Sequence, residues 1–351
     1  MRKWARLLHA AVIITCSVPA AQAGFQSDVA VTGDGKTVVA FKDRTLYVID
    51  GDTLTVRKRI WNEAKVKHLC FCNDGTKLVV ADDAKRLRIL DVATGAFDKE
   101  LEKMDPETVS FAPAVDLAAT IHSKTWTQSE IVLVSMTDAG IKARIALPEK
   151  FRTAGLALLP DGRKIIVFSH PLSDKEEKVP HAERPKDLKD LAKKEYDEKH
   201  DGQHMEILTY ALPDGKLESK KETWYTLKND TVVFTCGGDV LTVPYSNPAA
   251  RIQADGSVEL FKTPVFCNYG FGYSADGGSY LAGSLAAYAL VRPGKKKVET
   301  EIPRDQRLPG FPEYFYGFGF ALDGSAFGWT SGPRIGRIGP NGKLLKLVPV
   351  F

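Results

Sequence analysis

Histidine and cysteine side chains at alternate positions are the first candidates for chemistry in this sequence. His68, Cys70 and Cys72 lie within the stretch HLCFCNDG (68–75). On a β-strand, residues two apart lie on one face of the sheet, where imidazole and thiolate groups can ligate a metal ion. No second Cys/His pair lies nearby in the sequence, however. We therefore expect both cysteines to act as small hydrophobic residues in a repeated strand.

The heptad that contains these cysteines is repeated along the chain. LCFCNDG (69–75) has counterparts in VAVTGDG (29–35), VSFAPAV (109–115), LALLPDG (156–162), VVFTCGG (232–238), FGYSADG (271–277) and FGFALDG (318–324). Each copy is followed by three further short runs that are separated by turn residues, as hairpins require. Four short strands per unit of about 40 residues are typical of propeller blades, which bury their faces by stacking around an axis.

The fold predicted from this repeat is all-β: a seven-bladed β-propeller of four-stranded antiparallel blades, spanning 24–351. One charged, partly helical insertion interrupts blade four. The second and fourth heptad positions are mostly small, because the inner strands of a propeller converge on its axis. Each blade is continuous in sequence, so we expect no exchange of an N-terminal strand into the last blade. Closure of the ring would then depend on packing between the first and last blades.

Two segments carry a resemblance to known repeat families. LCFCNDGTKLVVADDAKRLRILDVATG (69–95) resembles a bacterial WD-repeat blade, and TLYVIDGDTLTV (45–56) is similar to the YVTN-type repeat. The resemblance implies a propeller of this family over essentially the whole of 24–351. No unit keeps the Gly-His dipeptide or the Trp-Asp ending of well-formed WD repeats, so we do not expect their buried hydrogen-bond network. Such motifs specify a fold and leave function open.

The N-terminus has the pattern of a secretory signal. Arg2, Lys3 and Arg6 precede an apolar run, and the stretch VPAAQA (18–23) ends in an A-x-A motif. This pattern predicts a signal peptide over 1–23, cleavage near Ala23, and a periplasmic or secreted mature protein. No later run approaches the about 20 apolar residues that a transmembrane helix needs.

The net charge limits the class of partner that we expect. Removing the three basic residues of the signal takes the formal net charge from +4 to +1, which gives no electrostatic basis for binding nucleic acid. The expected partners are a protein, a peptide or a small molecule.

Four cysteines remain after cleavage, Cys70, Cys72, Cys236 and Cys267. Their disulfide state stays open, including a bond between Cys236 and Cys267 of neighbouring blades.

The insertion SDKEEKVPHAERPKDLKDLAKKEYDEKHDGQH (173–204) lies between the expected second and third strands of blade four. It holds eight Lys and Arg and ten Asp and Glu residues, and the charged part after Pro185 favours a helix. Long surface loops are tolerated at small entropic cost, yet loops of this length are often lids or binding elements. Both alternatives remain open.

The loops between second and third strands share one side of a propeller with the segments that enter the inner strands, and that side surrounds one mouth of the central channel. Asp82 is among the residues expected at its rim. The candidates for ligand binding there are His68, Glu107, His122, Trp126, Arg152, His170, Asp230, Tyr245, Tyr269 and Tyr316. No metal or other cofactor is assigned. If the insertion folds over the mouth, His122, His170 and His204 become metal-ligand candidates.

Two segments, FCNYGFGY (266–273) and YFYGFGF (314–320), alternate aromatic residues with glycine. This alternation predicts rings on one side of the strand and close backbone approach on the other. Packing between blades six and seven is the first interpretation, and a pocket that stacks on a sugar or another ring is the second.

No catalytic motif such as G-x-S-x-G, H-E-x-x-H or a phosphate loop occurs in the sequence. The expected function is binding or scaffolding through the channel mouth. The alternative is a propeller enzyme at the same mouth, either cofactor-dependent or a lactonase-like enzyme with a metal held by Asp28, Glu107, Asp230 and the histidines. Sequence alone leaves open whether the chain is catalytic.

Overall fold

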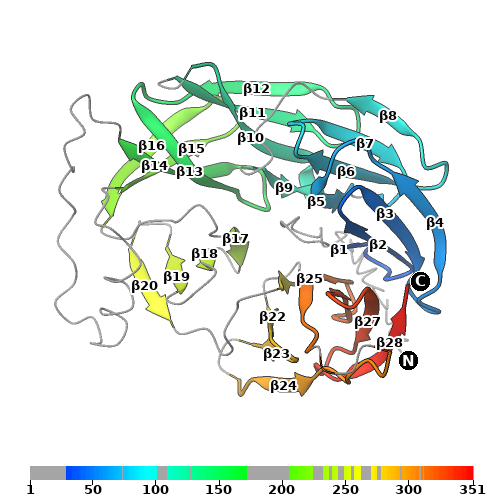
Figure 1. Ribbon diagram of the computed structural model, residues 1–351. Coiled ribbons are helices and arrows are strands. Elements are labelled where there is room, and N and C mark those ends of the chain that lie inside the picture. Colours follow the sequence, from blue (N-terminus) through cyan, green and yellow to red (C-terminus); the bar gives the residue numbers. More distant parts are fainter. Residues whose placement is uncertain are drawn as a thin grey trace, which may run out of the picture.

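The computed structural model describes residues 29–72, 74–100, 109–125, 128–171, 205–223, 232–236, 239–243, 249–253, 257–261, 270–274, 278–292, 295–307, 310 and 312–350. These residues form seven four-stranded antiparallel sheets, each made of four consecutive strands. Figure 1 shows the sheets arranged in a ring, with the first and last sheets side by side. The predicted seven-bladed all-β propeller is confirmed. Among the described residues, no helix has the length and apolar character needed to cross a membrane.

The first four blades follow one another in chain order. Blade one is β1 (Val29–Val31), β2 (Thr37–Lys42), β3 (Thr45–Asp50) and β4 (Val56–Trp61). Blade two is β5 (Val66–Phe71), β6 (Lys77–Asp82), β7 (Leu87–Asp91) and β8 (Phe97–Glu100). Blade three is β9 (Ser110–Ala112), β10 (Leu117–Ser123), β11 (Ser129–Ser135) and β12 (Ile141–Ala146), with a 3-10 turn, η2 (Pro113–Val115), after β9. Blade four is β13 (Phe151–Leu158), β14 (Lys164–Pro171), β15 (Met205–Ala211) and β16 (Lys216–Thr223).

The remaining three blades have the same order. Blade five is β17 (Val232–Cys236), β18 (Asp239–Val243), β19 (Ala249–Ile252) and β20 (Val258–Phe261). Blade six is β21 (Phe271–Tyr273), β22 (Tyr280–Ser284), β23 (Ala287–Val291) and β24 (Val298–Glu301). Blade seven is β25 (Phe315–Phe320), β26 (Ala326–Thr330), β27 (Arg334–Ile338) and β28 (Leu344–Pro349). The insertion 173–204, with its expected helix, lies outside the described residues.

The heptad ends in glycine because the turn from the first to the second strand requires a positive φ at this position. Gly35, Gly75, Gly162 and Gly324 turn the chain from first to second strand with φ of 70°, 69°, 67° and 79°. Side chains other than glycine rarely adopt this left-handed region. In blade three, where the heptad lacks glycine, η2 makes the turn and Asp116 takes the positive φ of 56°.

The small heptad positions are explained by close contact between neighbouring inner strands. Cys70 and Cys72 are free thiols, each 3% exposed, in a core shared by blades two and three. Cys72 Sγ donates to the carbonyl of Met136 at 3.1 Å, and burial raises the pKa of the Cys72 thiol to about 12. The prediction of a packing role for both cysteines is confirmed. Cys267 and the side chain of Cys236 lie outside the described part, so their pairing stays a prediction.

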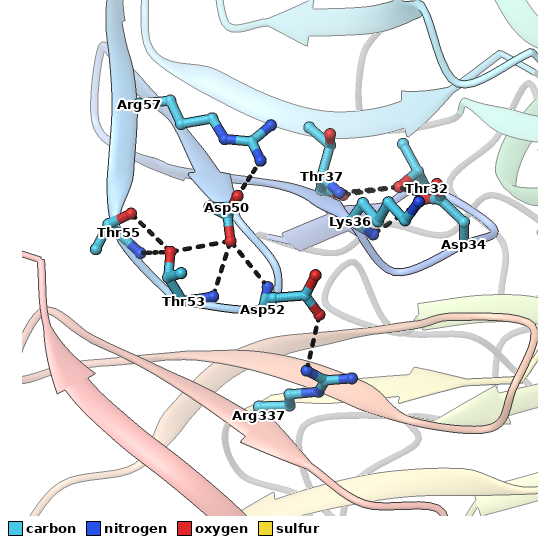
Figure 2. A network of polar contacts seen from close by, with 10 residues as sticks. All are labelled: Thr32, Asp34, Lys36, Thr37, Asp50, Asp52, Thr53, Thr55, Arg57 and Arg337. Atoms are coloured by element: carbon cyan, nitrogen blue, oxygen red, sulfur yellow. Dashed lines mark hydrogen bonds and ion pairs between the residues drawn. The ribbon is translucent and has the colours of Figure 1, made fainter.

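The ring closes between blades seven and one without strand exchange among the described residues. Tyr47 stacks on Trp329 with ring centroids 5.3 Å apart, inside an apolar cluster built from both blades. On the polar side, Arg337 of β27 forms an ion pair with Asp52 at 3.2 Å, as Figure 2 shows. The Leu322 N–H also donates to the Gly33 carbonyl at 2.8 Å. Closure by packing between first and last blades is therefore confirmed.

Candidate functional site

The side of the ring with the expected site is defined by two kinds of segment. One is the turns between second and third strands, and the other is the segments that lead into first strands. Backbone hydrogen bonds tie the two kinds together: Asn62 N–H to the Arg44 carbonyl, Asp83 N–H to the Lys65 carbonyl and Ala286 N–H to the Glu313 carbonyl. We call this side the insertion face, because the segment between β14 and β15 starts from it. The turns between first and second, and between third and fourth, strands form the opposite face.

Blade two has a buried polar cluster under the insertion face. Asp82, at the end of β6, is 0% exposed and accepts hydrogen bonds from Arg86 Nε at 3.0 Å and Asn62 Nδ2 at 3.3 Å. Arg88 of β7 donates to Asn62 Oδ1 and lies 3.6 Å from Asp82. Its guanidinium also lies 3.9 Å from the centre of the Phe97 ring. The expected rim residue Asp82 is thus a buried anchor that fixes the turn after β6 against the segment from blade one.

A second cluster lies in blade three around Glu130 of β11, which is 4% exposed. Its carboxylate is contacted by His122 Nδ1 at 3.1 Å, Lys124 Nζ at 2.7 Å and Arg144 at 2.5 Å. Burial alone raises the pKa of Glu130. The hydrogen bonds from Lys124, His122 and Arg144 outweigh that effect and lower the pKa to about 2.

Among the described residues, blade seven has a cluster of two carboxylates and two guanidinium groups. Glu313 accepts a hydrogen bond from the Thr330 hydroxyl at 2.8 Å and forms a two-pronged pair with Arg334. Arg334 also lies 3.9 Å from Asp305, whose carboxylate is held by the Arg307 guanidinium. The hydrogen bonds from Arg307 lower the pKa of Asp305 to about 2. In this cluster two carboxylates are matched by two guanidinium groups.

Blade four adds a simpler pair, since Glu206 of β15 is 8% exposed and lies 2.9 Å from Lys220 of β16. In the part of the chain that is described, four blades therefore place a buried carboxylate at the insertion-face end of their sheet. These clusters were not predicted from the sequence, which lacks the motifs of the WD-type buried network. The available signal was a charged residue inside an apolar run, as in LVVADDAKRLRIL (78–90).

The opposite face has local turn bonds as well as contacts between turns. Asp50 accepts hydrogen bonds from the N–H groups of Asp52 and Thr53 at 3.1 and 2.8 Å (Figure 2). Asp91 and Thr94 repeat the arrangement in blade two, with the Thr94 N–H donating to Asp91 at 2.7 Å. These bonds join residues two or three apart and shape single turns. Other bonds on this face reach further: Asp116 accepts hydrogen bonds from the hydroxyls of Ser135 and Thr137, and Lys346 Nζ donates to the Thr53 carbonyl at 2.7 Å between blades seven and one.

The predicted site residues fall into three groups. His68, His122, His170 and Tyr316 are described and lie near the insertion-face ends of β5, β10, β14 and β25. Arg152 lies in β13 opposite His170, but its side chain is outside the described part. Glu107, Trp126, Asp230, Tyr245, Tyr269 and His204 lie outside it as well. Of the described candidates, the structure brings His122 into the Glu130 cluster and leaves Tyr316 41% exposed.

The metal hypothesis has no support from the described side chains, which contain no group of three or more His, Cys, Asp or Glu residues that could hold an ion. His204 and the three carboxylates proposed for a lactonase-like site, Asp28, Glu107 and Asp230, lie outside the described ranges. The enzyme alternative therefore stays a prediction. The buried clusters themselves are paired and hydrogen-bonded, which suits them to fixing loop geometry.

Comparisons with solved structures support the fold. The chain is similar to Hydrazine Synthase of Kuenenia stuttgartiensis, with a TM-score of 0.60 and 12% sequence identity over 95% of this chain and 100% of that chain. It is also similar to the Cps50 (Swd1) β-propeller domain of Myceliophteria thermophila, with a TM-score of 0.58 and 13% identity over 90% of this chain and 96% of that chain. At these identities the likeness shows the β-propeller fold alone. No protein-family profile and no curated protein matches the sequence, and membership of the WD-repeat or YVTN-type family stays a prediction.

Proposed function

We propose that this propeller is an exported binding or scaffold module that engages a protein, peptide or small-molecule partner through its insertion face. The observation that carries the proposal is the placement of buried carboxylate clusters under this face in blades two, three, four and seven. Replacing a buried ion pair by apolar residues is often neutral or stabilising, so stability alone is a weak reason to keep one.

The clusters supply rigid geometry at the surface above them. Asp82 and Glu313 each connect a segment entering a blade with a turn between second and third strands, across 20 and 21 residues of sequence. A binding face that is ordered before its partner arrives loses less conformational entropy on binding. The opposite face also has bonds between turns and between blades, such as Lys346 Nζ to the Thr53 carbonyl at 2.7 Å. The carboxylate clusters that are buried among the described residues nevertheless lie under the insertion face, where β14 ends before the charged insertion. Export rests on the signal pattern at 1–23.

Site-specific photocrosslinking tests which face meets the partner. Leu285, in the turn between β22 and β23 on the insertion face, is 52% exposed, and Leu322, in a turn of the opposite face, is 50% exposed. A photoreactive phenylalanine analogue placed at either position would be irradiated in the source cells. We expect a discrete adduct from position 285 and none from position 322. Adducts from 322 alone, or the same adducts from both positions, would contradict the proposal.

A further inference from the structure

Blades one and two carry exposed cations at the insertion face. They lie at the turn between β2 and β3, in the segment that enters blade two, at the start of β5, and in the turn between β6 and β7. Within the described part of the chain, none of these side chains forms an ion pair. The five cations are Lys42, Arg44, Lys65, Lys67 and Lys85.

Backbone hydrogen bonds join these positions into one surface. The Asn62 N–H donates to the Arg44 carbonyl at 2.7 Å, which connects the turn of blade one to the segment that enters blade two. The Lys65 N–H donates to Asp83 Oδ1 and the Asp83 N–H donates to the Lys65 carbonyl, both at 2.9 Å. The turns of the two blades are therefore held on either side of the same segment, and their cations belong to one continuous surface.

The carboxylates of these segments are already engaged, with one exception. Glu63 pairs with Arg86 at 2.6 Å, and the buried Asp82 accepts a hydrogen bond from the same guanidinium. The Asp83 carboxylate accepts the backbone N–H described above. Asp43 is the remaining exposed carboxylate of these described segments. The five cations thus outweigh the acids around them, although the mature chain as a whole is close to neutral.

Two of the cations occupy unusual backbone positions. A register shift between Val66 and His68 makes Lys67 the extra residue of a β-bulge in β5, as Tyr316 is in β25. Bulges redirect side chains and are common beside binding sites. Lys85 has a φ of 61°, at a turn position where glycine or asparagine is usual. A lysine that is kept in this unfavourable conformation indicates a use for its charge.

An exposed tryptophan lies beside these cations. Trp61 is the last residue of β4, pairs with Thr45 next to Arg44, and is 66% exposed. Tryptophan and arginine are among the residues that contribute most to binding energy at protein interfaces. We call the five cations and Trp61 together the basic patch.

An anionic partner could be an acidic protein segment or an anionic lipid surface. Membrane binding scales with the apolar area that enters the lipid, and Trp61 gives the basic patch a single large apolar side chain. The exposed Asp43 and Asp83 would also face a continuous layer of headgroup phosphates. A peptide can instead place its carboxylates at the cations alone, as complementary interfaces do. We propose that the basic patch binds an acidic segment of a protein partner with Trp61 as its apolar anchor, a choice of partner class that rests on the insertion face being the binding face.

Fluorescence anisotropy with a labelled peptide of four Glu-Glu-Leu units tests the proposal. We expect a Kd of about 100 μM or tighter at about 50 mM salt, and weaker binding at about 300 mM salt because exposed charges are screened. A peptide of Lys-Lys-Leu units should not bind. The triple variant Lys42→Gln, Arg44→Gln and Lys65→Gln should weaken binding by about tenfold or more, and Trp61→Ala by about three- to tenfold.

The matched control is the triple variant Lys36→Gln, Lys296→Gln and Lys343→Gln, which removes the same charge from exposed turns of the opposite face. Thermal unfolding would first establish that all variants are folded. The proposal is wrong if the Glu-Glu-Leu peptide does not bind or if the control loses as much affinity as the patch variant. Trp61→Ala with the affinity of the parent would refute the anchor.

Vesicles of phosphatidylglycerol distinguish the two anionic partners. Vesicle binding that depends on the basic patch, without peptide binding, would overturn the proposal in favour of a lipid surface. If the peptide fails while position 285 still crosslinks, only the class of partner is wrong. If both fail, the binding face is wrong.

Discussion

Among single side chains, Glu130 shows how a buried charge couples the insertion face to pH. Its folded-state pKa of about 2 lies below the ordinary value of 4.5. Its contribution to stability is therefore fully present above about pH 4.5 and is lost as the pH falls towards 2. A shift of this size corresponds to an upper bound of about 3 kcal/mol. The three side chains that contact this carboxylate come from two strands and a turn of blade three, so the loss would loosen one part of the face.

Glu130→Gln should lower the free energy of unfolding at pH 7 by about 1–3 kcal/mol, because the neutral amide cannot compensate the charges of Lys124 and Arg144. The variant should also lose less stability than the parent between about pH 5 and pH 2. Urea titrations at several pH values in this range measure both effects.

Glu218→Gln is the control for the Glu130 variant, since Glu218 forms an exposed pair with Lys164 at 2.7 Å. Exposed pairs contribute about 0–1 kcal/mol. Parallel stability curves for the parent and Glu130→Gln would show that Glu130 is not held ionised by its neighbours.

At the scale of elements, glycine permits a close approach between the inner strands of two neighbouring blades. A Cβ added to Gly272 of β21 would lie 2.2 Å from the Phe318 carbonyl oxygen of β25. Beside this contact, Phe315 and Phe318 pack with ring centroids 4.8 Å apart. The interpretation of the aromatic and glycine segments as packing between blades six and seven is thus confirmed for the described residues.

Gly272→Ala should destabilise the protein by about 1–3 kcal/mol or more, because the obstacle is backbone that cannot rotate away. Thermal and urea unfolding measure the loss. Gly33→Ala is the matched comparison: its added Cβ would lie 2.9 Å from Leu322 Cδ1, the end of an exposed side chain that can move. Equal effects of the two substitutions would refute the argument from backbone contact.

The strands were predictable because their signals are local. Alternating apolar residues and turn glycines identify each strand of a blade, and the heptad sets the period. The buried clusters and the bulge at Tyr316 were not predictable in this way. Asn62 reaches Asp82, and Glu313 reaches Arg334, across turns and strands whose relative placement exists only in the folded ring. For the candidate site, the sequence predicted the insertion face and Tyr316, and both stay predictions; it did not predict the buried charged residues beneath that face.

For the whole molecule, the contact between blades seven and one determines whether the ring stays closed. Trp329 is 0% exposed and stacks on Tyr47, while the ion pair of Arg337 with Asp52 has an Asp52 side chain that is 69% exposed. Burial of a large aromatic residue contributes more than an exposed ion pair. The apolar cluster should therefore dominate closure.

Trp329→Ala should cost about 3–5 kcal/mol of unfolding free energy. Asp52→Asn should change it by less than about 1 kcal/mol. Trp329→Phe should fall between them, because it keeps a buried ring and removes an indole N–H that has no hydrogen-bond partner among the described residues. Urea unfolding of the three variants measures the order of their losses in unfolding free energy. A larger loss from Asp52→Asn than from Trp329→Ala would contradict closure by the apolar cluster.

Blades that are continuous in sequence also set an order of events during synthesis. Each four-stranded sheet can pair its own strands as soon as they leave the ribosome, because it needs no strand from elsewhere. The surface of blade one that packs against Trp329 stays uncovered until blade seven has been made, because Asp52 and Arg337 at this boundary are 285 residues apart. Until the last blade arrives, the nascent chain is an open arc with one apolar end uncovered. During that interval, the uncovered apolar surface of blade one is the part of the chain that a holding chaperone would bind.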